Sequence, residues 1–163
     1  MKVYGVTGWK NAGKTTLMER LVSEIAGRGV TVSTIKHAHH DTDVDQPGRD
    51  SYRHRTAGAR EVLLASPVRW ALMHELRDTP EPELSDLLPR LSPVDLVLVE
   101  GYKRADHPKI EAYRAANGRP PLAGKYPTIM AIATDTPLET DLPVLDLNDT
   151  AAIADFILEQ VGL

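Results

Sequence analysis

The stretch Gly8-Trp9-Lys10-Asn11-Ala12-Gly13-Lys14-Thr15 follows the apolar segment Lys2–Thr7 and matches the pattern G-x-x-x-x-G-K-[ST]. Glycines at both ends allow the backbone to curl, so that successive N–H groups point inward at a phosphate. Lys14 brings a cation to the β- and γ-phosphates, and the hydroxyl of Thr15 is a ligand for Mg²⁺. Because the pattern follows a strand-like segment and opens a helix-like one, it predicts a P-loop for a nucleoside triphosphate rather than a glycine-rich turn without a ligand.

A βαβ unit surrounds this loop. Residues 2–7 predict a strand, and an apolar stripe at three- and four-residue spacing predicts a helix over residues 14–26. The stripe consists of Leu17, Met18, Leu21, Val22 and Ile25. Gly27 and Gly29 end this helix, and the β-branched segment Val30–Ile35 predicts a second strand. Such a unit has parallel strands and a right-handed crossover.

Further elements follow along the chain. Helices are predicted at 50–57, 83–88 and 149–160, strands at 61–65, 68–73, 94–99, 109–113 and 128–133, and an exposed loop at 117–125. The first two of these strands are joined by the tight turn Ser66-Pro67, which predicts an antiparallel pair added to the parallel sheet. We therefore expect an α/β protein with a three-layer P-loop NTPase fold, in one domain spanning residues 1–163.

The composition is that of an ordinary globular protein, with 42% hydrophobic and 26% charged residues. Cysteine is absent, which excludes disulfides and thiolate metal sites. The net charge of −4 disfavours nucleic acid as a partner, because nonspecific binding to DNA rests on a basic excess. No apolar run approaches the roughly 20 residues of a membrane span, and the N-terminus runs directly into the P-loop. We expect a cytoplasmic protein without a membrane partner.

Two groups of basic residues lie close together in the sequence. The first comprises Arg49, Arg53, Arg55 and Arg60, and the second comprises Lys103, Arg104, Lys109 and Arg114. Each group either faces phosphates or forms a solvated helix face. Lys10 inside the P-loop either contacts phosphate or is simply solvated, and solvation is the slightly favoured interpretation.

Glu100 is the second candidate for chemistry. It ends the most apolar strand of the chain, and ligands collect at the carboxyl ends of parallel strands. We expect its carboxylate to bind Mg²⁺ through water or to polarise an attacking water, and thus to be a catalytic residue beside Lys14. The alternative is a surface acid at a strand end.

The polar loop from His37 to Asp45 carries three histidines and three aspartates. Such side chains are ligands for a divalent cation, and we place Asp41 beside Thr15 and Glu100 as a metal ligand. Zinc is the weaker candidate because adjacent histidines in a loop lack the spacing of a structural zinc site. For Asp45 a role near the nucleotide or a second substrate and a place in a solvated loop remain open.

Asp135 follows the last predicted strand, in the order Ala133-Thr134-Asp135. A carboxylate there accepts two hydrogen bonds from the N1–H and the exocyclic amine of guanine, which adenine does not offer in that pattern. An ordinary turn or helix-capping aspartate is the alternative.

Together these motifs resemble the molybdopterin-guanine dinucleotide biosynthesis adaptor family, usually called MobB. The resemblance spans roughly residues 2 to 135. It is carried by Gly8–Leu17, Lys36-His37 with His40-Asp41, Asp45–Ser51, Ala57-Gly58-Ala59, Leu98–Lys103 and Pro108–Glu111. The P-loop alone is common to very many proteins, whereas the stretches Asp45–Ser51 and Glu100-Gly101-Tyr102-Lys103 are much more specific.

The resemblance implies a dimeric GTP-binding protein with weak GTPase activity that assists the guanylyltransferase attaching GMP to molybdopterin. Molybdopterin itself is then a further candidate ligand. Nucleotide binding is assigned to Gly8, Asn11, Ala12, Gly13, Lys14, Thr15, Thr16 and Asp135, and the metal side to Thr15, Glu100 and Asp41. GTP and Mg²⁺ are the cofactors so implied. The Asn-Lys-x-Asp motif by which regulatory GTPases select guanine is absent, so guanine preference rests on the family and on Asp135.

Two other classes of P-loop protein are alternatives. A small-molecule kinase using ATP needs arginines that close over the γ-phosphate, and Arg49, Arg53 and Arg55 are candidates for that role. A partitioning or insertion ATPase carries a lysine directly after the first glycine of the loop. This chain has Trp9 there, which argues against that class.

Overall fold

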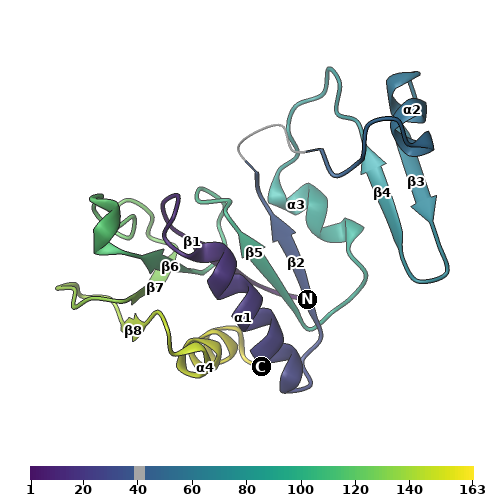
Figure 1. Ribbon diagram of the computed structural model, residues 1–163. Helices are drawn as coiled ribbons and strands as arrows, with labels where there is room; N and C mark the ends of the chain where they lie inside the picture. Colours follow the sequence, from purple (N-terminus) through teal and green to yellow (C-terminus); the bar gives the residue numbers. More distant parts are fainter. Residues whose placement is uncertain (39–42) are drawn as a thin grey trace. The chain divides into compact units, whose positions relative to one another are not determined.

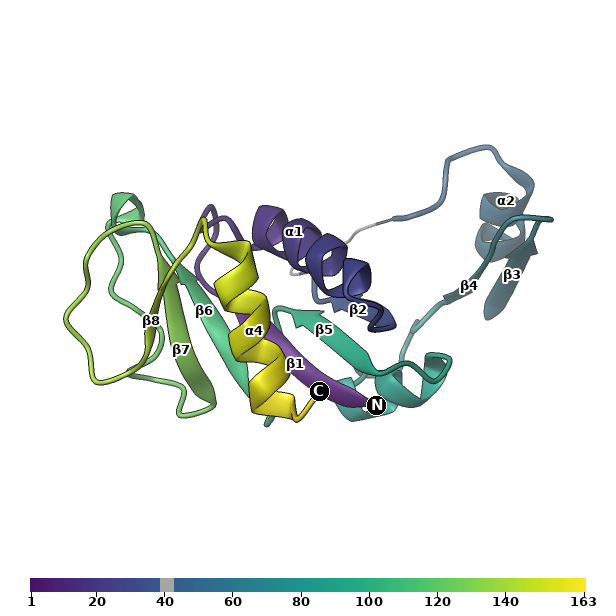
Figure 2. The same ribbon diagram turned by 90° about the horizontal axis from the view of Figure 1, so that it is seen from below.

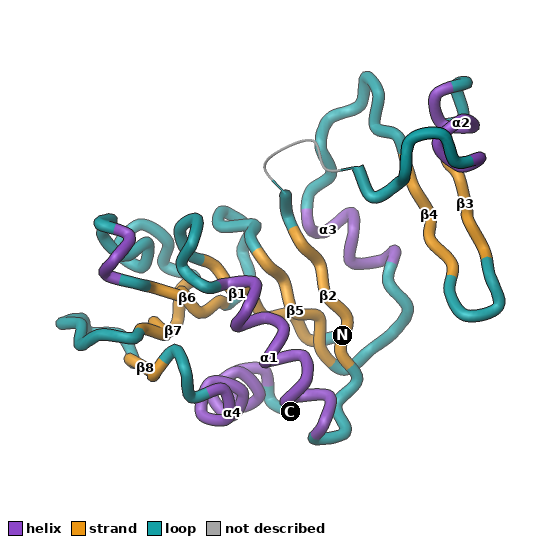
Figure 3. Tube along the Cα trace, in the orientation of Figure 1, coloured by secondary structure: helices purple, strands orange, loops and turns teal. Residues whose placement is uncertain are grey.

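The computed structural model of the chain describes residues 1–38 and 43–163. It forms two compact units. The larger comprises Met1–His37 and Leu88–Leu163, and the smaller comprises Ala38–Leu87. Helices and strands are distinguished by colour in Figure 3. No helix among the described residues is both long and apolar enough to cross a membrane.

The larger unit is built on a six-stranded sheet in the order β2-β5-β1-β6-β7-β8, in which every neighbouring pair is parallel (Figure 1). The strands are β1 (Lys2–Thr7), β2 (Val32–Lys36), β5 (Leu96–Glu100), β6 (Lys109–Tyr113), β7 (Ile129–Thr134) and β8 (Val144–Asp146). All six carboxyl ends therefore lie along one edge of the sheet. That edge is where ligands bind in open parallel sheets.

Two long helices, α1 (Lys14–Gly27) and α4 (Thr150–Val161), lie side by side against one face of this sheet (Figures 1 and 2). Their apolar stripes meet strand residues such as Tyr4, Leu98 and Ile110, all without solvent exposure. Short 3₁₀ turns at Leu88–Arg90 and Ala115–Asn117 complete the unit. The helix-facing side of the sheet is thus an ordinary hydrophobic core.

Polar side chains are buried on the opposite side of β6. Lys109 has no exposed surface, and its ammonium donates to the carbonyls of Ala105 and His107 and to the Thr128 hydroxyl at 2.7 Å each. The equally buried Glu111 accepts the backbone N–H groups of Leu122 at 2.8 Å and Ala123 at 2.9 Å. Burial lowers the pKa of Lys109 to about 8 and raises that of Glu111. Lys109 is therefore neither a phosphate-facing residue nor part of a solvated helix face.

The smaller unit contains α2 (Asp50–Thr56), the antiparallel pair β3 (Glu61–Ala65) and β4 (Trp70–His74), and α3 (Leu84–Leu87). Helix α2 packs on β3. The hairpin forms a two-stranded sheet of its own, so the antiparallel pair exists as predicted but does not extend the parallel sheet.

Most predicted elements are present, with ends shifted by one or two residues. The strand expected at 94–99 covers 96–100, and Glu100 is its last residue, as predicted. Strand β8 was not predicted from the sequence. Its three residues are too few to show the alternation of apolar and polar side chains that indicates a strand, and proline and acidic residues lie nearby. The expectation of one domain over residues 1–163 stays a prediction.

Candidate phosphate-binding site

The predicted P-loop connects β1 to α1 and has the backbone conformation that its glycines permit. Gly8 has φ 143°, Asn11 has φ 64° and Gly13 has φ 89°. A Cβ on Gly8 would lie 2.3 Å from the carbonyl oxygen of Ala112 on β6, so no other residue fits there without movement. The loop thus curls tightly over the carboxyl ends of β1 and β6.

The loop delivers the N-terminus of a 14-residue helix. Gly13 is the N-cap residue of α1, no side chain caps the helix, and no acidic residue stands in its first turn. The first N–H groups of a helix lack intrahelical partners, and the helix dipole adds positive potential there. Thr15 and Thr16 are exposed at this end, while Ala12 is buried beneath the loop. The arrangement is that of an anion site.

Lys14 is half-buried and turned back over the loop. Its ammonium donates a 2.7 Å hydrogen bond to the carbonyl of Trp9. Burial is the main cause that lowers the pKa of Lys14; the carboxylate of Glu100 opposes this, and Lys103 and Lys36 add to it. A cation that is already partly desolvated and surrounded by other cations gains strongly from an incoming phosphate.

Glu100, which the sequence predicts as a metal ligand, contacts the start of α1. The hydroxyl of Thr15 donates to Glu100 Oε1 at 3.1 Å, and Lys36 Nζ lies 3.7 Å from Glu100 Oε2. Since this hydroxyl donates its hydrogen bond to the carboxylate, its lone pairs remain available to a cation. A hydroxyl and a carboxylate oxygen suit Mg²⁺, which takes its other ligands from phosphates and water. The described residues hold no cluster of three or more His, Asp or Glu side chains suited to a metal.

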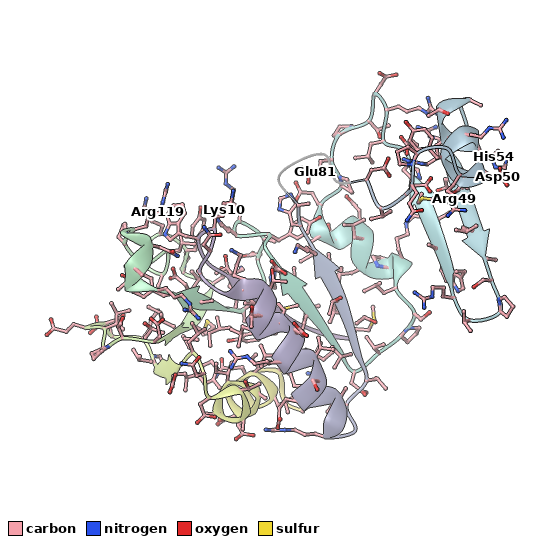
Figure 4. The ribbon with its side chains drawn as sticks, viewed as in Figure 1. Lys10, Arg49, Asp50, His54, Glu81 and Arg119 are labelled. Atoms are coloured by element: carbon pink, nitrogen blue, oxygen red, sulfur yellow. The ribbon has the colours of Figure 1, made fainter. Side chains whose placement is uncertain are left out.

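A cationic rim around Trp9 was not predicted from the sequence. Lys103 Nζ lies 5.0 Å and the Arg119 guanidinium 4.7 Å from the centre of the indole ring. The indole N–H donates to the carbonyl of Pro120 at 2.9 Å, which ties the P-loop to the loop after β6. Lys10 and Arg119 point outward from this end of the sheet (Figure 4). Lys10 is exposed, in keeping with a solvated residue.

Arg114, which follows β6, links the P-loop to Asp135. Its Nε would lie 3.4 Å from a Cβ on Gly13, so the guanidinium packs against the last glycine of the loop. Its NH1 lies 3.4 Å from Asp135 Oδ2. The sequence placed Arg114 in a basic group and Asp135 after a strand, but nothing in it indicated that they pair. In the structure, the guanidinium of Arg114 therefore lies between Asp135 and the P-loop.

The predicted ligands between His37 and Asp45 are only partly described. Asp41 lies outside the described residues. Asp45 accepts hydrogen bonds from the Ser51 hydroxyl at 2.9 Å and from Arg55 Nε at 3.1 Å. Arg55 also pairs with Asp43 and Glu75. In the smaller unit, therefore, Asp45 bonds to Ser51 at the start of α2 and to Arg55 near its end. Arg55 forms ion pairs with three carboxylates, those of Asp43, Asp45 and Glu75.

Comparison with known proteins identifies the family of the chain. Residues 3–135 match the family model described as "MobB: Molybdopterin guanine dinucleotide synthesis protein B". The chain belongs to the MobB family. It is 44% identical over 156 residues to the molybdopterin-guanine dinucleotide biosynthesis adapter protein of Escherichia coli (strain K12), covering 93% of this chain and 88% of the relative. The corresponding protein of Haemophilus influenzae is 45% identical over 157 residues, covering 94% and 85%.

Solved MobB structures share the fold. The crystal structure of a MobB protein homolog from Bacillus stearothermophilus has 30% sequence identity and a TM-score of 0.75, with 99% of both chains covered. The structure of Bacillus subtilis MobB has 24% identity and a TM-score of 0.77, covering 99% of this chain and 98% of that one. The predicted fold class, an α/β P-loop NTPase fold with a mostly parallel sheet and an added antiparallel pair, is confirmed.

Proposed function

We propose that this MobB-family chain is a GTP-binding adaptor in the biosynthesis of molybdopterin guanine dinucleotide and assists a molybdenum cofactor guanylyltransferase. Membership of the family supports the pathway, since the relatives from E. coli and H. influenzae are named as adapters in it. The geometry of the P-loop supports the proposal that the chain binds a nucleoside triphosphate.

One observation carries the proposal: Lys14, Thr15 and Glu100 converge at the N-terminus of α1. In this site the loop amides and Lys14 hold the β- and γ-phosphates, with Gly13 and Thr16 contributing backbone donors. Thr15 and Glu100 would hold Mg²⁺, which would supply positive charge to offset that of the phosphates. Asp135 supplies the acceptors for guanine.

The same residues favour holding GTP over hydrolysing it. Both oxygens of Glu100 already have partners, the Thr15 hydroxyl and the Lys36 ammonium. A carboxylate so engaged is a metal-side ligand rather than a free acceptor for the proton of an attacking water. We therefore propose weak GTPase activity at most.

The hairpin of the smaller unit supports a homodimer. Leu63, Leu72 and Trp70 lie on one face of the β3–β4 sheet, since Leu63 pairs with Leu72 and Trp70 pairs with Ala65 across the strands. Their exposed fractions are 60%, 44% and 64%. A contiguous exposed apolar face marks an interaction surface, and a second copy is the occupant that the family resemblance implies.

Calorimetric titration of GTP with Mg²⁺ into wild type, Lys14→Ala and Lys10→Ala tests the nucleotide assignment. Lys14→Ala is expected to abolish measurable binding, whereas Lys10→Ala, an exposed lysine of the same loop, keeps it within a few-fold. Undiminished affinity in Lys14→Ala contradicts the proposal. Phosphate transfer from ATP to a small acceptor, absent with GTP, would instead identify a kinase.

The adaptor assignment is tested with purified guanylyltransferase. We expect the two proteins to co-elute in size-exclusion chromatography and the addition of GTP to change the amount of complex. A transferase whose elution and activity are the same with and without this chain speaks against the adaptor role. Adding molybdopterin to each component separately shows which of them binds the pterin.

A further inference from the structure

Positive charge is concentrated in three segments at the carboxyl edge of the parallel sheet. Residues 8–16, 101–105 and 114–125 follow β1, β5 and β6, and together they contain seven lysines and arginines and no aspartate or glutamate. These cations are Lys10, Lys14, Lys103, Arg104, Arg114, Arg119 and Lys125. The chain as a whole has a net charge of −4. An otherwise acidic protein thus carries a basic edge, which favours an anionic partner there.

Four of these cations form the cationic rim around Trp9, namely Lys10, Lys103, Arg104 and Arg119. Lys10, Arg104 and Arg119 are exposed, and Lys103 is half-buried. Lys10 and Arg119 point outward (Figure 4). Among residues 1–38 and 43–163, no carboxylate forms an ion pair with any of the four. The rim therefore differs from Lys36 and Arg114, whose charges are paired with Glu100 and Asp135.

The rim is held in place before any partner binds. Lys103 Nζ lies 5.0 Å and the Arg119 guanidinium 4.7 Å from the centre of the Trp9 ring. The indole N–H donates to the carbonyl of Pro120 at 2.9 Å, next to Arg119 in the chain. Buried Glu111 anchors the following part of the same loop by accepting the backbone N–H groups of residues 122 and 123. Side chains fixed in this way lose little conformational entropy on binding.

The composition of the rim favours a protein as the partner. Tryptophan and arginine are the side chains most enriched at the centres of protein interfaces. A single-stranded nucleic acid would need a free aromatic face for base stacking, and the Trp9 ring already carries two cations. The net charge of −4 also disfavours nucleic acid. Unpaired lysines and arginines around a fixed tryptophan match a protein surface rich in carboxylates.

We propose that the cationic rim is the docking surface for an acidic patch of the guanylyltransferase, with Arg119 over Trp9 at its centre. The proposal rests on the proposed function and deepens it by assigning a surface to the partner. Docking here places the transferase at the same edge of the sheet as the P-loop. Complementary charges of this kind mainly accelerate association, and salt weakens their effect.

The experiment measures the association and dissociation of the full chain on immobilised guanylyltransferase by biolayer interferometry, with GTP and Mg²⁺ present, at low and high NaCl. Wild type is compared with Arg119→Glu, Arg119→Lys, Arg104→Glu and Lys2→Glu. Lys2 is exposed at the start of β1, at the opposite edge of the sheet, so its variant makes the same change of net charge outside the rim. Urea denaturation checks the stability of each variant, and calorimetry measures its affinity for GTP.

We expect Arg119→Glu to raise the dissociation constant for the transferase about tenfold or more at low salt, mainly through slower association. Arg104→Glu should raise it several-fold. Arg119→Lys and Lys2→Glu should stay within about twofold of wild type, because the first keeps the charge and the second lies outside the rim. The difference between wild type and Arg119→Glu should shrink at high salt. Affinity for GTP should change less than about threefold in Arg119→Glu, since this side chain points away from the P-loop.

Two results overturn the docking surface. If Arg119→Glu and Arg104→Glu bind the transferase as wild type does, the partner docks elsewhere. If Arg119→Glu weakens GTP as much as it weakens the transferase, the rim serves the phosphates of the nucleotide instead. In both cases a transferase that binds wild type leaves the proposed function standing. If the transferase does not bind wild type at all, the adaptor function and the docking surface fail together.

Discussion

The hydroxyl of Thr15, in the first turn of α1, donates a 3.1 Å hydrogen bond to Glu100 at the end of β5. The two residues are 85 positions apart, and parallel pairing of β1 with β5 brings them together. Glu100 also lies 3.7 Å from the ammonium of Lys36 at the end of β2. Side chains from α1, β2 and β5 thus meet at the carboxylate of Glu100, beside the phosphate loop.

This contact predicts how GTP binding depends on magnesium. Glu100→Gln keeps the size of the side chain but removes the charge that a divalent cation needs. We expect the gain in GTP affinity on adding Mg²⁺ to fall about tenfold, while binding in EDTA is unchanged or stronger because a negative charge near the phosphates is gone. Calorimetry with and without Mg²⁺ measures both. Glu159→Gln, an exposed glutamate of α4, is the control, and an intact magnesium effect in Glu100→Gln would remove this residue from the metal site.

The conformation of the loop predicts that replacing Gly8 by alanine strongly destabilises the fold. Its φ of 143° is unfavourable for alanine, and the new Cβ would approach the carbonyl oxygen of Ala112 to 2.3 Å. We expect Gly8→Ala to lower the free energy of unfolding by about 2–3 kcal/mol and to abolish GTP binding. Urea denaturation and titration with GTP check the two effects. Gly124→Ala, where a Cβ would meet nothing within 4 Å, should change neither, and a stable, binding-competent Gly8→Ala would contradict the loop geometry.

His107 predicts a loss of stability in mild acid. The ring is buried against Gly5, and both of its nitrogens are without a hydrogen-bond partner among the described residues. Burial, with a smaller contribution from Lys109, lowers its pKa to about 4 from the usual 6.5. The unfolded chain therefore takes up the proton first, and stability falls as the pH drops from about 6.5 to 4.

The matching measurement is urea denaturation between pH 7 and 4. Wild type should lose about 3 kcal/mol more than His107→Leu over this interval, since one pKa unit corresponds to roughly 1.4 kcal/mol. His54→Phe, which replaces an exposed histidine of α2, controls for the loss of any histidine. Parallel curves for wild type and His107→Leu would show that the imidazole is not responsible.

The apolar face of the hairpin predicts the oligomeric state. Leu63→Glu puts a charge at the centre of the face formed by Leu63, Leu72 and Trp70. We expect the dissociation constant of the dimer to rise about a hundredfold or more, because the interface would bury an unpaired carboxylate. Sedimentation equilibrium measures it. Val68→Glu, in the turn and 83% exposed, should leave the dimer intact; a dimer that survives Leu63→Glu places the interface elsewhere.

Much of this protein follows from local sequence patterns. The P-loop, the amphipathic helix α1 and the buried strand β5 were predicted because glycine spacing, a 3.6-residue period and a continuous apolar run act over a few residues. Glu100 was predicted as a site residue for the same reason, since it ends an apolar strand. These local patterns predict a triphosphate site on a parallel sheet.

Only the tertiary structure decided which distant residues complete that site. Arg114 packs on Gly13 and pairs with Asp135, Trp9 carries Lys103 and Arg119, and the charged Lys109 is buried rather than solvated. Each of these contacts depends on the order of the strands in the sheet and on the course of the connecting loops. Strand order is set by packing over the whole chain, so no short pattern encodes it. The sequence by itself therefore determined the glycine-rich loop that we propose binds phosphate, and the fold decided which residues surround this loop.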